Sequence, residues 1–338
     1  MKSLFNRNFD NDIVVIAEVG VNHEGNYKRA KKLIESLVKT DVDAIKLQSF
    51  TVEKYCSTSD MKRFNMLKSF SLSKEDHVKL ANVVHKKNKA FLSTPVTEDW
   101  VEFISEIGDA IKIASGDITF EPVIKKAALQ KKPVILSTGA SKLKEVIKAI
   151  KIFEKFSTKK KLLKNKLALL HCVSSYPANF SECNLMSIPF LKQKFNLITG
   201  WSNHVLGKNI NIAAVALGAQ IIELHVTDNK NSGPFRDHAL SYEVKELDQL
   251  IKEMRDIRKA VGVFHKNPSK LELKNVKNLR KGIVAARNIK KGETLLKKDL
   301  SFARPFIDFS SNDLRSLIGK TLKKSVSTGN VILKKNIK

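Results

Sequence analysis

Residues 200–225 begin Gly200-Trp201-Ser202-Asn203-His204, continue through a helical pattern over residues 210–217, and end Ile221-Ile222-Glu223-Leu224-His225. A short buried strand is predicted before each histidine. A strand–helix–strand unit of this length makes its two strands parallel. Because neighbouring strands lie about 5 Å apart, His204 and His225 are expected to leave the same edge of one sheet.

Two histidines so placed are close enough to share a metal ion. Two imidazoles leave coordination positions open, which is typical of a catalytic site rather than a closed structural one. The alternative is a pair of unrelated histidines that happen to end two strands.

The same alternation of strand and helix extends over the first 260 residues. Eight short apolar runs occupy residues 13–17, 44–47, 90–93, 110–114, 133–137, 167–172, 197–200 and 220–225. Helical patterns between and after them include residues 27–39, 74–87, 141–156 and 244–261, with Ser73 and Ser141 predicted to begin two of them. Buried runs that alternate with helices indicate a parallel α/β fold, and eight of them predict a closed (β/α)8 TIM barrel.

Nearly every apolar run is followed by a side chain capable of chemistry. In chain order these are Glu18, Lys46, Gln48, Thr94, Lys112, Ser115, Asp117, Ser137, His171, Tyr176, Ser202, His204 and His225. In a (β/α)8 barrel such positions meet at the rim formed by the carboxyl ends of the strands, where these enzymes keep their active sites. Any one of them could be a capping or core residue, but their recurrence from run to run favours an active site.

Composition limits the class of protein. The 338 residues are 42% hydrophobic and 28% charged, as in ordinary globular proteins. No apolar run approaches the ~20 residues needed to cross a bilayer, and Cys56, Cys172 and Cys183 lack metal-type spacing. A reduced, cytoplasmic protein with no membrane association is therefore expected.

The formal charge of +27 at pH 7 needs an explanation. Lysines are scattered over the chain rather than clustered with aromatic residues, which argues against nucleic-acid binding. A positive field that attracts an acidic, phosphorylated substrate fits better, although lysine-rich codon usage would give the same surplus.

The pattern changes after Gly262. Residues 263–280 are polar and lysine-rich and are interpreted as a linker with a short helix. Residues 281–338 contain short β-runs separated by glycine turns, which predict a small, mostly β domain. The predicted organisation is therefore a barrel over 1–262, a linker over 263–280 and a second domain over 281–338.

Several motifs resemble the sialic acid (N-acetylneuraminate) synthase family. They are residues 16–25 (IAEVGVNHEG), 45–48 (IKLQ), 112–117 (KIASGD), 171–177 (HCVSSYP) and 202–204 (SNH). The C-terminal segment resembles the antifreeze-like (SAF) domain that follows the barrel in that family. The resemblance extends from about Ile13 to Leu333.

The resemblance implies a transferase that condenses phosphoenolpyruvate (PEP) with an N-acetylated hexosamine to give a nonulosonic acid and phosphate. The hexosamine would be N-acetylmannosamine or a bacterial 2,4-diacetamido relative. PEP carries a phosphate and a carboxylate, so its pocket needs cations and hydrogen-bond donors. The family's PEP-binding positions correspond to Lys46, Lys112, Ser115, Ser137 and Ser202.

The resemblance also implies a divalent ion, Mn²⁺ or Mg²⁺, bound by His204 and His225 and acting as a Lewis acid on the sugar aldehyde. Glu18 corresponds to the family's catalytic carboxylate, with proton transfer or hydrogen bonding as its role. The sugar-binding positions correspond to Gln48, Asp117, Tyr176, Asp237 and Arg304. Arg304 would reach the sugar from the partner subunit of a domain-swapped homodimer, with Arg287 as the competing arginine.

Two departures from the family pattern bear on the sugar. The first is Ser174, at a position where asparagine is common. The second is the segment from Leu224 to His238, in which Leu224 replaces a lysine and Phe235-Arg236 is inserted before Asp237. These changes leave legionaminic acid and related bacterial sugars open as products. A metal-dependent aldolase or hydrolase on the same barrel, and a carbohydrate-binding protein without catalysis, are the competing functional classes.

Overall fold

The structure is a computed structural model that describes residues 1–157, 163–232 and 236–338. Two compact units make up the chain, Met1–Gly262 and Val263–Lys338. Phe235, the first residue of the insertion noted above, lies outside the described residues.

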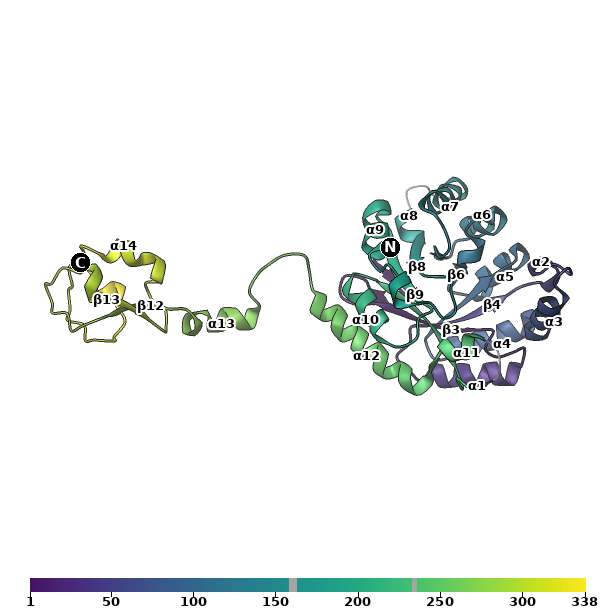
Figure 1. Ribbon diagram of the computed structural model, residues 1–338, viewed down its shortest axis with the longest axis horizontal. Helices are drawn as coiled ribbons and strands as arrows, with labels where there is room; N and C mark the ends of the chain where they lie inside the picture. The colour runs from purple at the N-terminus through teal and green to yellow at the C-terminus, as the bar shows by residue number, and fades with distance from the viewer. Residues whose placement is uncertain (158–162, 233–235) are drawn as a thin grey trace. The chain divides into compact units, whose positions relative to one another are not determined.

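The first unit contains a closed barrel of parallel strands (Figure 1). The strands are β3 (Val14–Gly20), β4 (Ala44–Ser49), β5 (Ala90–Pro95), β6 (Ala110–Ile113), β7 (Val134–Ser137), β8 (Leu167–His171), β9 (Ile198–Asn203) and β10 (Ile221–Thr227). Each strand pairs with the next in the chain, and β10 pairs with both β9 and β3, which closes the cylinder. The predicted (β/α)8 barrel is confirmed, including the parallel neighbours that end near His204 and His225.

Helices surround the barrel (Figure 1). They are α1 (Tyr27–Leu37), α2 (Val52–Tyr55), α3 (Met61–Phe70), α4 (Lys74–His85), α5 (Val101–Ile107), α6 (Glu121–Leu129), α7 (Leu143–Phe156), α8 (Leu163–Lys166), α9 (Ser187–Phe195), α10 (Asn209–Ala216), α11 (Arg236–Leu240) and α12 (Val244–Val261). Ser73 caps α4 through a reciprocal capping box with Asp76, as predicted. The prediction for Ser141 was wrong: α7 begins at Leu143, because the Ser141 hydroxyl donates to the Thr138 carbonyl within the preceding turn.

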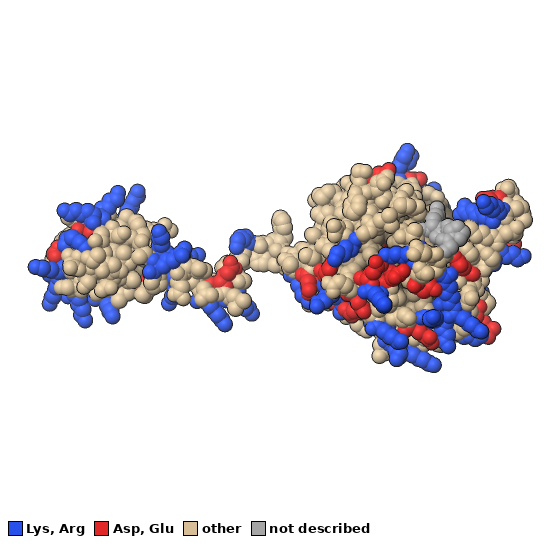
Figure 2. All heavy atoms as spheres, turned by 60° about the horizontal axis from the view of Figure 1, so that its bottom comes forward, with Lys and Arg blue, Asp and Glu red and all other residues tan. Residues whose placement is uncertain are grey.

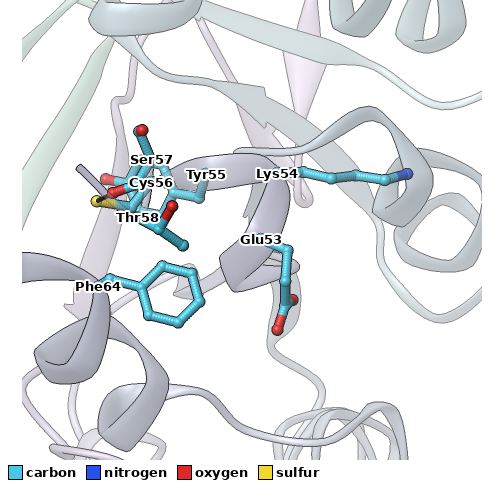
Figure 3. Close-up of a pocket in the computed structure, with 7 residues that line it drawn as sticks. All are labelled: Glu53, Lys54, Tyr55, Cys56, Ser57, Thr58 and Phe64. Carbon is cyan, nitrogen blue, oxygen red and sulfur yellow. Dashed lines mark hydrogen bonds between the residues drawn. The ribbon is translucent and has the colours of Figure 1, made fainter. Parts of the chain in front are cut away.

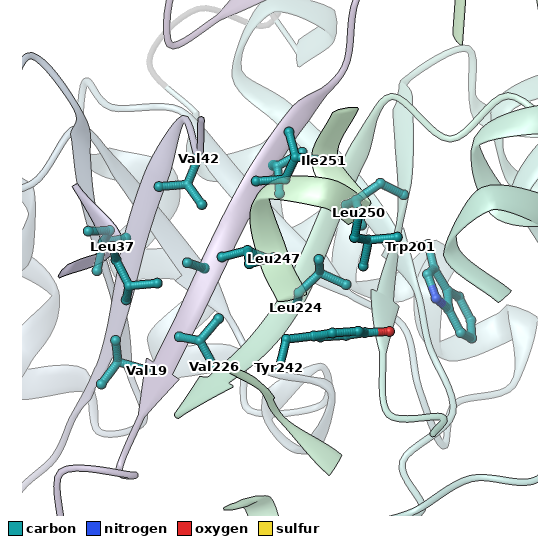
Figure 4. Packing of buried hydrophobic residues seen from close by; sticks show 14 of the residues in the cluster. Val19, Leu37, Val42, Trp201, Leu224, Val226, Tyr242, Leu247, Leu250 and Ile251 are labelled. Carbon is teal, nitrogen blue, oxygen red and sulfur yellow. The ribbon is translucent and has the colours of Figure 1, made fainter. Parts of the chain in front are cut away.

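Alternate residues of each strand face outward and pack on these helices. Leu224 and Val226 of β10 share one hydrophobic cluster with Leu247, Leu250 and Ile251 of α12 (Figure 4). This cluster is fully or nearly fully buried and extends to α1, α4 and α10. The outward face of the barrel is thus the main apolar core, and the opposite face of each strand points into the cylinder.

The amino ends of the strands are closed by a hairpin of β1 (Ser3–Leu4) and β2 (Arg7–Asn8). Leu4 and Phe9 pack with the inward-facing side chains at the base of the cylinder. Asp43, just before β4, accepts hydrogen bonds from Arg7 Nε at 2.6 Å and from Arg255 Nη2 of α12 at 3.1 Å. This buried ion cluster ties the hairpin, the sheet and the last barrel helix together.

The second unit is small and rich in short β-structure. It begins with α13 (Lys270–Leu279), none of whose residues is buried, and contains the antiparallel pair β12 (Gly282–Ala285) and β13 (Leu300–Ala303) and the one-turn helix α14 (Leu314–Leu317). Its core includes Ile283, Leu295, Leu322 and Ile332.

Among the charged residues of the second unit, basic ones far outnumber acidic ones on the face that Figure 2 shows. Residues 263–338 contain 19 lysines and arginines but five acidic residues, so this quarter of the chain supplies about half of the formal charge of +27. In the part of the chain that the structure describes, no helix is long and apolar enough to cross a membrane.

Candidate active site

The barrel interior consists of an apolar layer at the base and a polar layer above it. Each strand contributes small or branched apolar residues to the lower layer, among them Ile16, Ala44, Ala110, Ile135 and Ile221. Two residues further along each of these strands the same face carries Glu18, Lys46, Lys112, Ser137 and Glu223. Because side chains two apart in a strand share a face, the polar residues necessarily follow the apolar ones into the cylinder, towards the carboxyl ends of the strands.

Four charged side chains of opposite sign alternate across this polar layer. Glu18 Oε2 lies 2.5 Å from Lys46 Nζ, which is 3.6 Å from Glu223 Oε2. The other oxygen of Glu223, Oε1, lies 3.7 Å from Lys112 Nζ. All four side chains are at most 4% exposed. Two buried cations and two buried carboxylates thus balance one another.

The two carboxylates differ in acidity. Burial raises the pKa of Glu18 to about 7, and the charge of Glu223 adds to this against the attraction of Lys46. Burial alone would also raise the pKa of Glu223, but Lys112 and Lys46 hold it at about 2. Glu223 therefore stays ionised, whereas Glu18 can exchange a proton near neutral pH. Paired groups whose environments separate their pKa values are characteristic of acid–base sites.

The lysine ammonium groups direct their hydrogen bonds to hydroxyl groups. Lys46 Nζ donates to Thr94 Oγ1 at 3.0 Å, and Lys112 Nζ donates to Ser137 Oγ at 2.7 Å. Burial lowers the pKa of Lys112 against the opposing charge of Glu223. For Lys46, burial would lower the pKa, but Glu18 and Glu223 outweigh it and raise the pKa. Cations and hydroxyls held this closely form a site suited to an anion with several oxygens.

Ser115 lies beside this cradle, at the end of β6. Its Oγ accepts a hydrogen bond from the Gly139 backbone N–H at 3.0 Å and lies 2.9 Å from Cys172 Sγ. A Cβ at Gly139 would come within 2.4 Å of Ser174 Oγ and 2.9 Å of Ser115 Oγ, so a larger residue here would force these side chains or the turn to shift. Ser174, which stands where asparagine is common in the family, therefore packs against the same turn as Ser115.

His204 and His225 face each other, with ring centroids 5.3 Å apart. The Val173 carbonyl accepts a hydrogen bond from His204 Nδ1 at 2.6 Å, which leaves the Nε2 lone pair of His204 available. Burial lowers the pKa of His204 to about 4 and that of His225 to about 3, so both rings are neutral at pH 7.

This pair fits a divalent ion. His225 Nδ1 is buried and forms no hydrogen bond of normal geometry among the described residues, and the nearby Asn203 backbone partly offsets the lowering of the His225 pKa. No group of three or more His, Cys, Asp and Glu side chains suited to a metal occurs in the described ranges. The chain therefore offers two imidazoles, and the remaining ligands would have to be oxygens of substrate or water.

The side chains predicted to bind the sugar lie at several points around the two histidines and Glu18. Gln48 Nε2 donates to Glu18 Oε1 at 3.3 Å, and the Tyr176 ring stacks on His204 at a centroid distance of 4.1 Å. Asp117 ends the turn after β6, and burial raises its pKa to about 6. Asp237, in α11, is buried, and its backbone carbonyl accepts a hydrogen bond from Ser241 Oγ.

Comparison with known proteins gives the family. The model of the NeuB family matches residues 33–266, and that of the SAF domain matches residues 280–338. The chain belongs to the NeuB family. The N,N'-diacetyllegionaminic acid synthase of Campylobacter jejuni is 39% identical over 94% of this chain and 98% of its own length. The protein of the same name from Legionella pneumophila is 34% identical over 96% of this chain and 94% of its own.

A solved structure of the family agrees with this assignment. The N-acetylneuraminic acid (sialic acid) synthetase of Leptospira borgpetersenii, in complex with citrate, superposes with a TM-score of 0.75 at 34% identity. The match covers 81% of this chain and 94% of that one.

The structure places one of the other departures from the NeuB family pattern, Leu224. Leu224 is fully buried on the outward face of β10 against α12, whereas its neighbours Glu223 and His225 point inward. The change from lysine to leucine at this position therefore affects packing rather than the barrel mouth. Phe235 lies outside the described residues.

The two candidate arginines of the SAF domain differ in their surroundings. Arg287 donates to Asp299 Oδ1 and to Glu293 Oε2, both at 2.8 Å, within its own domain. Arg304 follows β13 and is exposed, with no ion pair to another described residue. Arg304 is thus the arginine available to an outside ligand, and its place at the barrel of a partner stays a prediction.

Glu223 is the site residue that sequence reasoning missed. It lies in the polar layer between the two lysines and accepts a hydrogen bond from Ser202 Oγ at 2.9 Å. A signal was present, because a glutamate two residues before His225 in a buried strand must share the inward face.

Two surface cavities lie outside this polar layer. The larger, about 460 Å³, is formed by α2 and the turn before α3 and is lined by Glu53, Lys54, Tyr55, Cys56, Ser57, Thr58 and Phe64 (Figure 3). The other, about 370 Å³, includes Cys172 and Ser174 in its lining. Neither is lined by a residue predicted to bind PEP, sugar or metal. Cys56, Cys172 and Cys183 are all buried free thiols.

Proposed function

We propose that this chain is a synthase that condenses PEP with an N-acetylated hexosamine to give a nonulosonic acid and phosphate. One observation carries the proposal. A cradle of two buried lysines and several hydroxyls lies beside a carboxylate whose pKa is near neutrality and a pair of neutral, facing imidazoles. The membership of the NeuB family and the names of its relatives support it.

We further propose that the hexosamine carries two acetamido groups. The two legionaminic acid synthases are named for an N,N'-diacetyl product and match nearly the whole chain. The serine at position 174 in place of asparagine is a further reason to expect a sugar other than N-acetylmannosamine, which remains the alternative.

In the proposed reaction, the enol carbon of PEP forms a bond to the aldehyde carbon of the open-chain sugar. Water adds to the second carbon of PEP, and the resulting tetrahedral intermediate loses phosphate by cleavage of its carbon–oxygen bond. Lys46 and Lys112 would bind the anionic groups of PEP, with Ser115 and Ser137 as hydroxyl partners.

Glu18 is the residue that would carry the proton. It lies between the lysine cradle and the histidines, because His225, Glu18 and Lys46 are register partners on the neighbouring strands β10, β3 and β4. A pKa of about 7 lets it give a proton to the aldehyde oxygen as the new bond forms. Gln48 would hold the carboxyl group in place through its amide.

His204 and His225 would hold Mn²⁺ or Mg²⁺, which supplies Lewis acidity to the sugar carbonyl when bound. The chain's contribution is to keep both imidazoles neutral and correctly turned. Burial keeps both imidazoles neutral, and the hydrogen bond to the Val173 carbonyl fixes the orientation of the His204 ring.

We propose that the working form is a domain-swapped homodimer in which Arg304 of one subunit completes the sugar site of the other. The exposed apolar residues of the segment after the barrel support an intermolecular role. Phe264 is fully exposed, Leu271 and Leu273 of α13 are 73% and 58% exposed, and α13 buries no residue. A cytoplasmic location is part of the same proposal, since PEP is an intracellular metabolite.

Incubation of the purified chain with PEP, Mn²⁺ and a panel of N-acetylated hexosamines tests the function. Phosphate and a new 2-keto acid should appear in equal amounts, with a 2,4-diacetamido hexosamine as the best substrate. Turnover of N-acetylmannosamine alone would retain the reaction class but contradict the proposed sugar. Absence of phosphate release with every sugar would overturn the proposal.

A further inference from the structure

We propose that Glu223, which accepts a hydrogen bond from Ser202, is a positioning residue for PEP binding that holds the two lysines of the cradle in place. The inference rests on the proposed function, because it concerns how the PEP site is prepared. It concerns two residues of neighbouring strands, β10 and β9, that are register partners in the sheet.

Glu223 balances both lysines while leaving their hydrogen-bond donors free. Its carboxylate oxygens lie 3.6 Å from Lys46 Nζ and 3.7 Å from Lys112 Nζ, which is close for charge attraction but long for a hydrogen bond. Lys46 Nζ donates to Thr94 Oγ1 and lies against Glu18 Oε2, and Lys112 Nζ donates to Ser137 Oγ and to the Ile113 carbonyl. Because an ammonium group has three hydrogens, one on each lysine remains for an arriving anion, which need not displace Glu223.

Without Glu223 the two lysines would lose the carboxylate that they share. Glu18 lies against Lys46 alone, so Lys112 would be a buried cation with no carboxylate among the described residues within ion-pair distance. A buried charge that has lost its partner is strongly unfavourable. The side chain would respond by turning away or releasing its proton, and either response would weaken the PEP site.

Ser202 is committed to Glu223. Its hydroxyl donates to Glu223 Oε1 at 2.9 Å, and both side chains are buried. A hydroxyl has one hydrogen to donate, and here that hydrogen fixes the position of the Glu223 carboxylate between the two lysines.

An opposite effect is conceivable for a carboxylate beside a phosphate site. If Glu223 mainly competed with PEP for the lysines, its removal would tighten PEP binding. The positioning role predicts weaker binding, so the sign of the change distinguishes the two.

The test measures PEP binding to the full-length chain by isothermal titration calorimetry, with Mn²⁺ present and no sugar. Glu223→Gln should weaken PEP binding at least tenfold, and Ser202→Ala by about threefold. Ser202→Ala removes the hydrogen bond to Glu223 but leaves the charge of Glu223 in place, so its loss should be smaller than that of Glu223→Gln. At saturating PEP, the KM for the sugar should be unchanged in both single variants.

Asp43→Asn is a matched control. Asp43 is also a buried carboxylate shared by two cations, but it lies at the amino ends of the strands. This variant should lower the melting temperature and leave PEP affinity unchanged. If Glu223→Gln does not fold, Glu223→Asp keeps the charge, retracts it by one methylene and should still bind PEP more weakly than the wild type.

Unchanged or tighter PEP binding in the Glu223 variants would overturn the inference. A loss in Ser202→Ala as large as that in Glu223→Gln would show that the charge of Glu223 is not what prepares the PEP site, and would also overturn the inference. A wild-type chain that binds no PEP would overturn the proposed function itself, an outcome distinct from both.

Discussion

Glu18 and Lys46 form a buried ion pair, with Glu18 Oε2 and Lys46 Nζ 2.5 Å apart, between two neighbouring strands of the barrel. On the other side of Glu18, the register partner is His225. Three adjacent strands thus place a histidine, a carboxylate and a lysine in one row. The carboxylate is the common neighbour of the group that would bind metal and the group that would bind PEP, which makes it the natural carrier of a proton between the two substrates.

Glu18→Gln should therefore abolish turnover while the fold is retained. Gln keeps the shape and a carbonyl acceptor for Gln48 but cannot exchange a proton near pH 7. Loss of general acid–base catalysis typically costs about 100-fold or more in kcat. Phosphate release from PEP under saturating sugar measures the effect, and circular dichroism establishes that the barrel is intact.

Glu253→Gln is the control for this variant, because Glu253 lies on the surface of α12 and pairs with Lys208. Its activity should equal that of the wild type. If the kcat of Glu18→Gln were within twofold of the wild-type value, Glu18 would not be the residue that transfers the proton.

Metal affinity should be nearly constant between pH 7.5 and 5.5. The neutral imidazole binds metal, and burial holds the pKa values of His204 and His225 at about 4 and 3, so protons compete only well below pH 5. Two ordinary histidines with pKa about 6.5 would together lose roughly 100-fold in affinity over this range. Equilibrium dialysis with Mn²⁺ at several pH values measures this, and a 100-fold loss by pH 5.5 would contradict the buried, neutral pair.

Gly139→Ala should impair PEP binding through Ser115. The added Cβ would come within 2.9 Å of Ser115 Oγ and within 2.4 Å of Ser174 Oγ, so the turn or the serine must move. We expect PEP affinity to fall about tenfold, as is common when a bound group loses a well-placed hydrogen-bond partner. Isothermal titration calorimetry with PEP provides the measurement.

Gly116→Ala is the matched control, because this glycine follows Ser115 directly and a Cβ there meets nothing within 4 Å. It should bind PEP as the wild type does. Equal losses in the two variants would mean that the turn at Gly139 has no special part in the cradle.

Much of the barrel could be predicted because strand periodicity is a local property. The eight apolar runs coincide with β3 to β10 to within three residues at each end, and the helix predicted over 244–261 is α12. The polar residues after each run then follow from the two-residue repeat of a strand. Ser141 shows where this reasoning fails, because a serine can bond a nearby turn carbonyl instead of capping the next helix.

The charge relationships inside the barrel could not be predicted in the same way. Glu223 lies on β10 and Lys112 on β6, and only closure of the cylinder brings their side chains within 3.7 Å. The hydrogen bond from Ser202 to Glu223 depends on side-chain orientation, which a sequence pattern does not contain. Periodicity indicates which face a residue occupies, and contacts across the cylinder require the three-dimensional structure.

The proposed domain swap makes a sharp prediction for mixed dimers. Arg304→Ala and His225→Ala should each be inactive as homodimers, the first for lack of the sugar-binding arginine and the second for lack of a metal ligand. In a heterodimer of the two, the intact barrel of the Arg304→Ala subunit would receive Arg304 from its partner, and about half of the wild-type activity per dimer should return. If Arg304 served its own barrel, neither site would be complete and the heterodimer would be inactive. Two different affinity tags allow the heterodimer to be isolated and assayed for phosphate release. Arg287→Ala is the control, because Arg287 is already paired with Asp299 and Glu293 in its own domain. It should not cause the loss of activity that Arg304→Ala causes.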